Sequence, residues 1–114
     1  MSGDGFRSAT DLAAAVRAGD RSPVDLVDAA LDRIDSYGDR TNAFVTVLDE
    51  RPRERAREIE ATVETGGDPG PLAGVPVAIK DLADTKAGVT HTYGLAPLAD
   101  NVADRTTVAV ERLE

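Results

Sequence analysis

The sequence predicts an α/β fold, in which helices accompany two strands of a larger mixed sheet. Several stretches space their apolar residues as helices do, whereas 43–48 and 75–79 are short apolar runs with β-branched side chains. The second run is apolar at nearly every position, which is typical of a strand buried on both faces. Because two strands do not make an independently stable sheet, we expect these 114 residues to be incomplete as a domain.

The first two helices are predicted from their start and stop signals. A helix over 10–18 follows Ser8, which has the spacing of a capping residue, and Gly19 supplies a stop. A second helix follows Ser22, with a proline in its first turn, and we expect it to end at Gly38.

The rest of the chain alternates between loops and two further predicted elements. A charged helix is expected over 52–64, and its interleaved arginines and glutamates indicate a solvated face. A loop over 65–71 leads to the strand 75–79, and a second loop runs to about residue 103. Either Asp104 or Thr106 then caps a last helix, and we expect its apolar side chains to point inward: Val108, Val110 and Leu113.

The composition excludes several classes of site and partner. The net charge of −8 gives a surface that repels nucleic acid and anionic membranes. The absence of cysteine excludes disulfides, thiolate metal sites and cysteine nucleophiles, and it fits a reducing cytoplasm. No apolar run follows Met1 as a signal peptide would, and none approaches the roughly 20 residues that span a bilayer. We therefore expect a cytoplasmic protein that binds neither nucleic acid nor membrane.

The balance among charged residues suggests a hypothesis about the source organism. Aspartate outnumbers glutamate, and arginine greatly outnumbers lysine. This pattern suggests a salt-adapted or GC-rich organism. A melting temperature that stays flat from low to molar KCl would contradict salt adaptation.

The run from Pro71 to Asp81 carries the strongest chemical signal. An apolar strand ends in Lys80, one of only two lysines in the chain. Burial disfavours an ammonium group, and an unprotonated lysine can act as a base. The alternative, favoured by spacing alone, is a lysine at a strand end that reaches solvent. We interpret Asp81 as a turn residue and His91, the only histidine, as a loop residue that makes no metal site.

The stretch from Leu72 to Asp81 resembles the amidase signature family. Four shorter pieces follow in the family's order: 85–89, 92–94, 104–105 and 108–113. The likeness extends from about residue 8 onward. It implies that 1–114 is the N-terminal part of a single amidase-signature domain, with a helical region over 1–66 and the start of the signature core over 71–114.

The resemblance also implies a reaction and one catalytic residue. Members of the family hydrolyse carboxylic amides to acid and ammonia through a Ser–cis-Ser–Lys triad, without a metal or organic cofactor. The family's lysine corresponds to Lys80. None of the chain's serines matches a triad position, so we expect the chain alone to be inactive; they are Ser2, Ser8, Ser22 and Ser36. The residues that bind the small amide substrate are not identified by the sequence.

Two other interpretations remain open. The chain could belong to the glutamine-hydrolysing subunit of a tRNA-dependent amidotransferase, which resembles the same family and passes ammonia to partner subunits. It could instead be a non-catalytic truncated remnant or an interaction piece. The lack of triad serines and the last helix, which ends after barely two turns, favour this second interpretation for the 114 residues alone.

Overall fold

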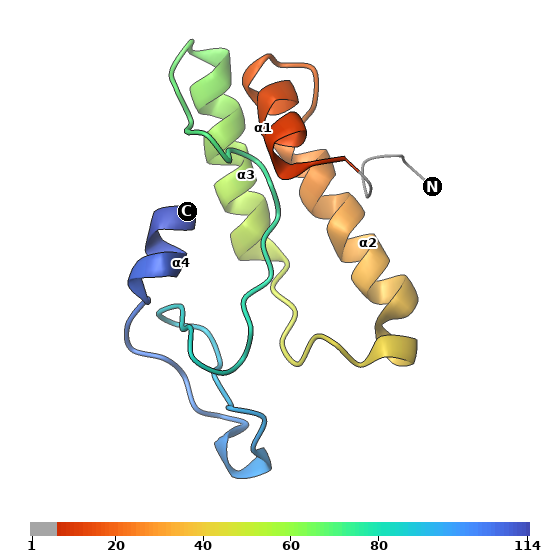
Figure 1. Ribbon diagram of the computed structural model, residues 1–114, viewed down its shortest axis with the longest axis vertical. Coiled ribbons are helices and arrows are strands. Elements are labelled where there is room, and N and C mark those ends of the chain that lie inside the picture. Colours follow the sequence, from red (N-terminus) through yellow and green to blue (C-terminus); the bar gives the residue numbers. More distant parts are fainter. Residues whose placement is uncertain (1–6) are drawn as a thin grey trace. The chain divides into compact units, whose positions relative to one another are not determined.

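Helices are the main regular elements of residues 7–114, the part of the chain that the computed structural model describes. The chain divides into a first unit that ends at Pro76 and a second unit over Val77–Glu114. The first unit contains α1 (Ala9–Arg17), α2 (Pro23–Thr41) and α3 (Glu50–Glu64) (Figure 1). The second contains the short 3-10 helix η2 (Ala96–Leu98) and α4 (Val108–Leu113).

Two serines cap the first two helices, as predicted. The Ser8 hydroxyl oxygen accepts a hydrogen bond from the backbone N–H of Asp11 at 3.1 Å. The Ser22 hydroxyl oxygen accepts one from the N–H of Asp25 at 3.4 Å, and Pro23 occupies the first turn of α2. Each cap satisfies a donor that has no partner inside its helix.

The end of α2 differs from the prediction. The helix continues past Gly38 to Thr41 and ends at Asn42, which has a left-handed backbone with φ of 50°. The Asn42 N–H donates to the Gly38 carbonyl at 2.7 Å. A glycine inside a helix costs only about 1 kcal/mol relative to alanine, and asparagine adopts the left-handed conformation readily. Gly38 is therefore tolerated within the helix rather than ending it.

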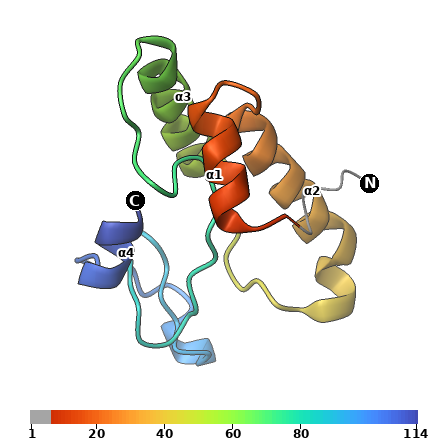
Figure 2. The same ribbon diagram turned by 45° about the horizontal axis from the view of Figure 1, so that its top comes forward.

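The core of the first unit lies between its three helices and the segment that follows α3. Both α1 and α2 contact α3, and Figure 2 shows α1 lying over the other two helices. Burial of these apolar side chains is the main stabilising contribution to the unit. The core comprises Leu12, Val16, Leu26, Ile59 and Ala73, with Val63 and Val75 packed against it.

The start of the family-like run belongs to this core. Gly74 has φ of +78°, and a Cβ atom built there would lie 2.9 Å from a methyl group of Val16 and 3.0 Å from Cβ of Pro23. No larger residue fits this position without displacing α1 or α2. One guanidinium nitrogen of Arg17 donates to the carbonyls of Gly70 at 3.3 Å and Pro71 at 2.9 Å. This segment is thus held closely against α1.

The predicted α/β fold is wrong for the described residues, which are helical. Neither 43–48 nor 75–79 forms a strand, and the β-bridge found within residues 7–114 joins Thr90 to Val102. β-branched residues favour an extended backbone, but a strand also needs backbone hydrogen bonds to a neighbour. Neither segment pairs with another part of the described chain, and Val45 and Val77 stay 66% and 55% exposed.

The second unit has little regular structure and depends on hydrogen bonds between 85–91 and 101–107. Side chains supplement the backbone bonds: the Thr85 hydroxyl donates to the Arg105 carbonyl at 2.8 Å. The backbone bonds run from Gly88 to Ala103 (2.9 Å), from Ala103 to Val89 (3.0 Å), from His91 to Asn101 (2.8 Å) and from Thr107 to Thr85 (3.0 Å), each named donor first.

The last helix, α4, begins after Thr107, close to the predicted start. Of the three side chains predicted to point inward, Val110 is buried, whereas Val108 and Leu113 are exposed. A six-residue helix spans fewer than two turns. Within residues 7–114, Val110 is the α4 side chain that is buried.

Candidate functional site

Lys80, the predicted catalytic residue, lies in the second unit on an irregular segment just before a turn over residues 81–83. Its side chain is exposed and forms no hydrogen bond or ion pair with residues 7–114. Its backbone carbonyl accepts a hydrogen bond from the N–H of Leu82 at 2.9 Å. The backbone after Lys80 is therefore restrained, while the amine is left available.

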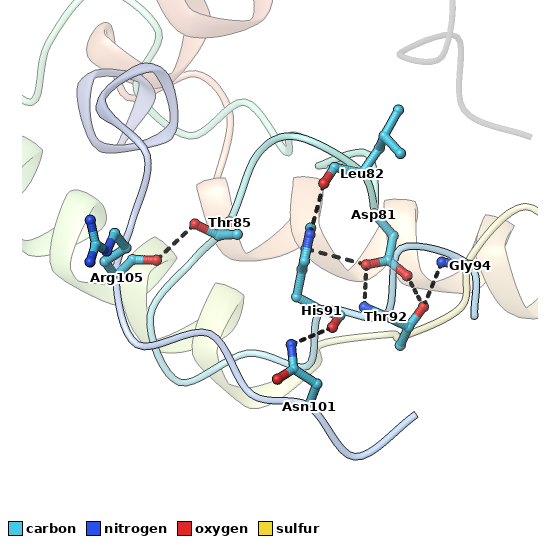
Figure 3. Close-up of polar contacts among 8 residues, drawn as sticks. All are labelled: Asp81, Leu82, Thr85, His91, Thr92, Gly94, Asn101 and Arg105. Carbon is cyan, nitrogen blue, oxygen red and sulfur yellow. Dashed lines mark hydrogen bonds and ion pairs between the residues drawn. The ribbon is translucent and has the colours of Figure 1, made fainter. Parts of the chain in front are cut away.

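Asp81 places its carboxylate against Thr92, eleven residues further along the chain. One oxygen accepts the Thr92 backbone N–H at 2.8 Å, and the other accepts a very short hydrogen bond from the Thr92 hydroxyl. The Thr92 hydroxyl oxygen in turn accepts the N–H of Gly94 at 3.1 Å. Figure 3 shows these bonds converging on the Asp81 carboxylate and the Thr92 hydroxyl. The sequence predicted only a turn role for Asp81.

The imidazole ring of His91 lies close to both Asp81 and Leu82. Its Nε2 lies 2.8 Å from the carbonyl oxygen of Leu82, and its Nδ1 lies 3.3 Å from a carboxylate oxygen of Asp81. A carbonyl oxygen can only accept, so Nε2 carries a hydrogen. The ring is 5% exposed and stands edge-on to Tyr93, with centroids 4.3 Å apart. We call Asp81, Leu82, His91, Thr92 and Gly94 the Asp81 clasp.

The hydrogen bonds of the clasp change the acidity of its carboxyl group. The Thr92 hydroxyl has the largest effect in lowering the pKa of Asp81, followed by the Thr92 backbone N–H. Both bonds stabilise the ionised form. The nearby His91 lowers this pKa further, while partial burial works in the opposite direction. Asp81 is therefore held as a carboxylate at neutral pH.

The loop that carries Thr92 makes a tight turn with an unusual backbone. Tyr93 and Gly94 both have positive φ, 55° and 74°, and the N–H of Leu95 donates to the Thr92 carbonyl at 2.9 Å. A left-handed backbone costs a residue such as tyrosine roughly 1–2 kcal/mol. The bonds that Thr92 makes to Asp81 and Gly94 offset part of this cost.

Asn101 forms hydrogen bonds to the backbone of His91. Its side-chain amide donates to the carbonyl of His91 at 2.8 Å, and its own carbonyl accepts the His91 N–H at 2.8 Å (Figure 3). The backbone of His91 is therefore bonded on both its polar groups, which fixes where the imidazole ring sits.

The catalytic role of Lys80 stays a prediction, and the sequence did not indicate the contacts made by the residues that follow it. His91 was predicted to be a plain loop residue, yet it is buried with both ring nitrogens near oxygen atoms. Asp84, three residues after Asp81, lies outside the clasp and accepts a bond from the Thr107 hydroxyl at 3.2 Å. No signal in the sequence marked Thr92 as the partner of Asp81, because their contact depends on how the intervening loop folds.

The serines of residues 7–114 either cap helices or lie on a helix surface. Ser8 and Ser22 are the helix caps described above, Ser36 is exposed on α2, and Ser2 lies outside the described residues. Within residues 7–114, no three His, Cys, Asp or Glu side chains gather as a metal site would require. In the same part of the chain, no helix has both the length and the apolar character needed to cross a membrane.

Known proteins resemble this chain over most of its length. It is 39% identical over 106 residues to an acylamidase from Rhodococcus erythropolis, a match that covers 93% of the chain and 22% of the relative. It is 42% identical over 106 residues to a glutamyl-tRNA(Gln) amidotransferase subunit from Salinispora tropica, covering 93% of the chain and 21% of the relative. The chain thus spans about a fifth of the length of these curated relatives.

A family model gives the same result. The model described as Amidase matches residues 25–114, which include Lys80 and the whole Asp81 clasp. A further glutamyl-tRNA(Gln) amidotransferase subunit, from Carboxydothermus hydrogenoformans, is 37% identical over 109 residues, a match that covers 96% of the chain and 22% of the relative. The resemblance carried by Leu72 to Asp81 is therefore confirmed, and the chain belongs to the amidase family.

Proposed function

We propose that this chain is the N-terminal part of an amidase-type hydrolase and that Lys80 is the base of its Ser–cis-Ser–Lys triad. Membership of the family supports the reaction class. The observation that carries the role of Lys80 is the family-like run that ends at it, inside the matched residues 25–114. Within residues 7–114 its side chain is exposed, so the proposal requires that residues from outside this sequence bury the amine. The two serines would come from sequence outside these 114 residues, as the short coverage of the relatives suggests.

The proposed reaction has two stages. The unprotonated Lys80 amine takes a proton from the intermediate serine, which takes one from the nucleophilic serine. The nucleophile attacks the carbonyl carbon of a small carboxylic amide, and the C–N bond breaks to release ammonia and leave an acyl-enzyme. Water then attacks the acyl group and releases the acid. The proposal requires no metal or organic cofactor.

A segment exchange tests this proposal. The matched 106-residue segment of the Rhodococcus erythropolis acylamidase is replaced by that of this chain, and ammonia release from amides is measured. We expect the hybrid to be active and Lys80→Ala to lower kcat/KM by about 10²–10⁴-fold, the usual contribution of a general base. Lys86→Ala, which removes the other lysine of the chain, should change kcat/KM little.

Two results would contradict the proposal. A hybrid that keeps its activity after Lys80→Ala would remove the base role from Lys80. Ammonia release by the 114-residue chain alone, abolished by Lys80→Ala, would show that the chain needs no residues from outside itself.

A second candidate is the amidotransferase subunit, because the Salinispora tropica relative is as similar as the acylamidase. In this case the substrate would be glutamine, and the ammonia would pass to partner subunits. The same exchange made in the Salinispora tropica protein, assayed with its partner subunits for glutamate formation, separates the two. Activity only in the amidotransferase hybrid favours this candidate, and inactivity in both hybrids favours a non-catalytic role.

A further inference from the structure

We propose that Asp81 is a positioning residue for Lys80: it fixes the backbone from which the lysine extends, while its own charge is kept away from the amine. The functional meaning of this inference rests on the proposed base role of Lys80. The contacts that carry it lie wholly within the second unit, in the Asp81 clasp.

The first step concerns the number of donors around Asp81. Two donors reach its two oxygens, the backbone N–H and the hydroxyl of Thr92. Hydrogen bonds to an ionised carboxylate are stronger than those between neutral groups. Because both oxygens are used, the Asp81 side chain has a fixed orientation, and so does the backbone that joins it to Lys80.

The second step concerns Leu82, which is held independently of the carboxylate. Its carbonyl faces Nε2 of His91 at 2.8 Å, and its N–H donates to the Lys80 carbonyl at 2.9 Å. Both residues that follow Lys80 are thus bonded to the loop at His91 and Thr92. This loop is itself held by Asn101, so the restraint extends beyond one contact.

The third step concerns charge. An aspartate next to a lysine favours the ammonium form when its carboxylate is free to approach the amine. Here both oxygens of the carboxylate accept hydrogen bonds from Thr92, and the Lys80 amine has no ion-pair partner among residues 7–114. The clasp therefore restrains the lysine through its backbone, and its carboxylate forms no ion pair with the amine.

Nuclear magnetic resonance of the 114-residue chain tests this inference without any activity. We measure the ¹⁵N order parameters of the Lys80 and Leu82 amides in the wild type and in three variants: Asp81→Ala, Thr92→Val and Thr92→Ser. Thr92→Val keeps the shape of the buried side chain but removes its hydroxyl. Asp100→Ala is the matched control, because Asp100 is exposed and its side chain has no partner in the described part of the unit.

We expect order parameters near the rigid value of about 0.85 in the wild type and below about 0.6 in Asp81→Ala and Thr92→Val. Thr92→Ser should restore the rigid value, because it returns the hydroxyl. That rescue separates positioning by the hydroxyl from a general loss of structure, and Asp100→Ala should match the wild type. The Nζ resonance of Lys80 should shift in Thr92→Val while that of Lys86 stays in place.

Three results would overturn the inference: flexible Lys80 and Leu82 amides in the wild type, unchanged order in Thr92→Val, or no rescue by Thr92→Ser. If Asp81→Ala does not fold, the two Thr92 variants still decide the matter. An inactive segment hybrid would count against the proposed function alone, because the order parameters do not depend on catalysis.

Discussion

The two units of the chain are stabilised in different ways. The first unit buries apolar side chains from three helices, among them Leu12, Val16 and Leu26. The second unit has only η2 and α4 as helices, and hydrogen bonds such as those of Asp81 and Asn101 hold its loops. The family-like run has residues in both units. Gly74 packs in the apolar core of the first unit, whereas Lys80 directly precedes the hydrogen-bonded Asp81 clasp of the second.

The largest expected effect comes from emptying the core of the first unit. Leu26→Ala removes a buried side chain and should lower the free energy of unfolding by about 2–5 kcal/mol, because the lost burial adds to the cost of a cavity. Thermal unfolding followed by circular dichroism at 222 nm measures this. Leu72→Ala makes the same change at a partly exposed position and should cost much less. Equal losses in both variants would contradict the described core.

A pair of glycine substitutions should give effects of opposite sign. Gly74→Ala places a methyl group against Val16 and Pro23 in a left-handed backbone, so we expect a loss of about 1–3 kcal/mol. Gly38→Ala lies inside α2 with no atom within 4 Å of the added carbon. It should stabilise the first unit by about 0.5–1 kcal/mol. Destabilisation by Gly38→Ala would mean that α2 ends there after all.

Lowering the pH should break the hydrogen bonds that the Asp81 carboxylate accepts in the second unit. The pKa of Asp81 is lower in the folded chain than in the unfolded chain, chiefly because of the Thr92 hydroxyl. The clasp is therefore complete above the unfolded-state pKa and is lost as the pH falls through the lower, folded value. The chemical shift of the Thr92 amide from pH 7 to pH 2 reports this change.

The matched variant for that titration is Asp81→Asn, which cannot ionise. Its Thr92 amide shift should not respond to acid in the same range. A wild-type Thr92 amide that titrates at or above the ordinary pKa of an aspartate would show that the clasp does not form in solution.

The smallest expected effect concerns a surface ion pair between helices of the first unit. Arg53 donates to Asp28 at 2.8 Å across α3 and α2, and both side chains are partly exposed. Arg53→Gln should therefore lower stability by only about 0.2–1 kcal/mol. Arg55→Gln, which loses a pair within α3, is the control. In 1 M KCl the two variants should become alike, since charges are screened within about 3 Å.

The helices could be predicted because their signals are local. Ser8 and Ser22 cap donors three residues away, so the pattern is complete within one turn. The exact end of α2 was less predictable, because Gly38 can either stop a helix or sit inside one, and only the position of Asn42 decides. Local sequence signals therefore predicted the presence of a helix more reliably than the residue at which the helix ends.

The prediction of two strands was wrong and the clasp was missed for a shared reason: strand pairing and the clasp both depend on partners distant in the sequence. The residues of 43–48 and 75–79 have strand-like composition, but no described segment pairs with them. Asp81 and Thr92 meet across eleven residues, through a loop whose shape no periodicity encodes. The prediction that Lys80 is catalytic came only from the likeness of the motif around it to a known family, and it stays a prediction.

The guanidinium of Arg17, which donates to the carbonyls of Gly70 and Pro71, has a consequence for handling the protein in acid. Arginine keeps its proton at every pH at which proteins are studied. This tether therefore has no titratable switch, unlike the carboxylate at Asp81. Strong acid, below the ordinary pKa of an aspartate, should therefore break the bonds of Asp81 to Thr92 while the Arg17 tether persists, and an acid-stable protease should then cut first between residues 82 and 91.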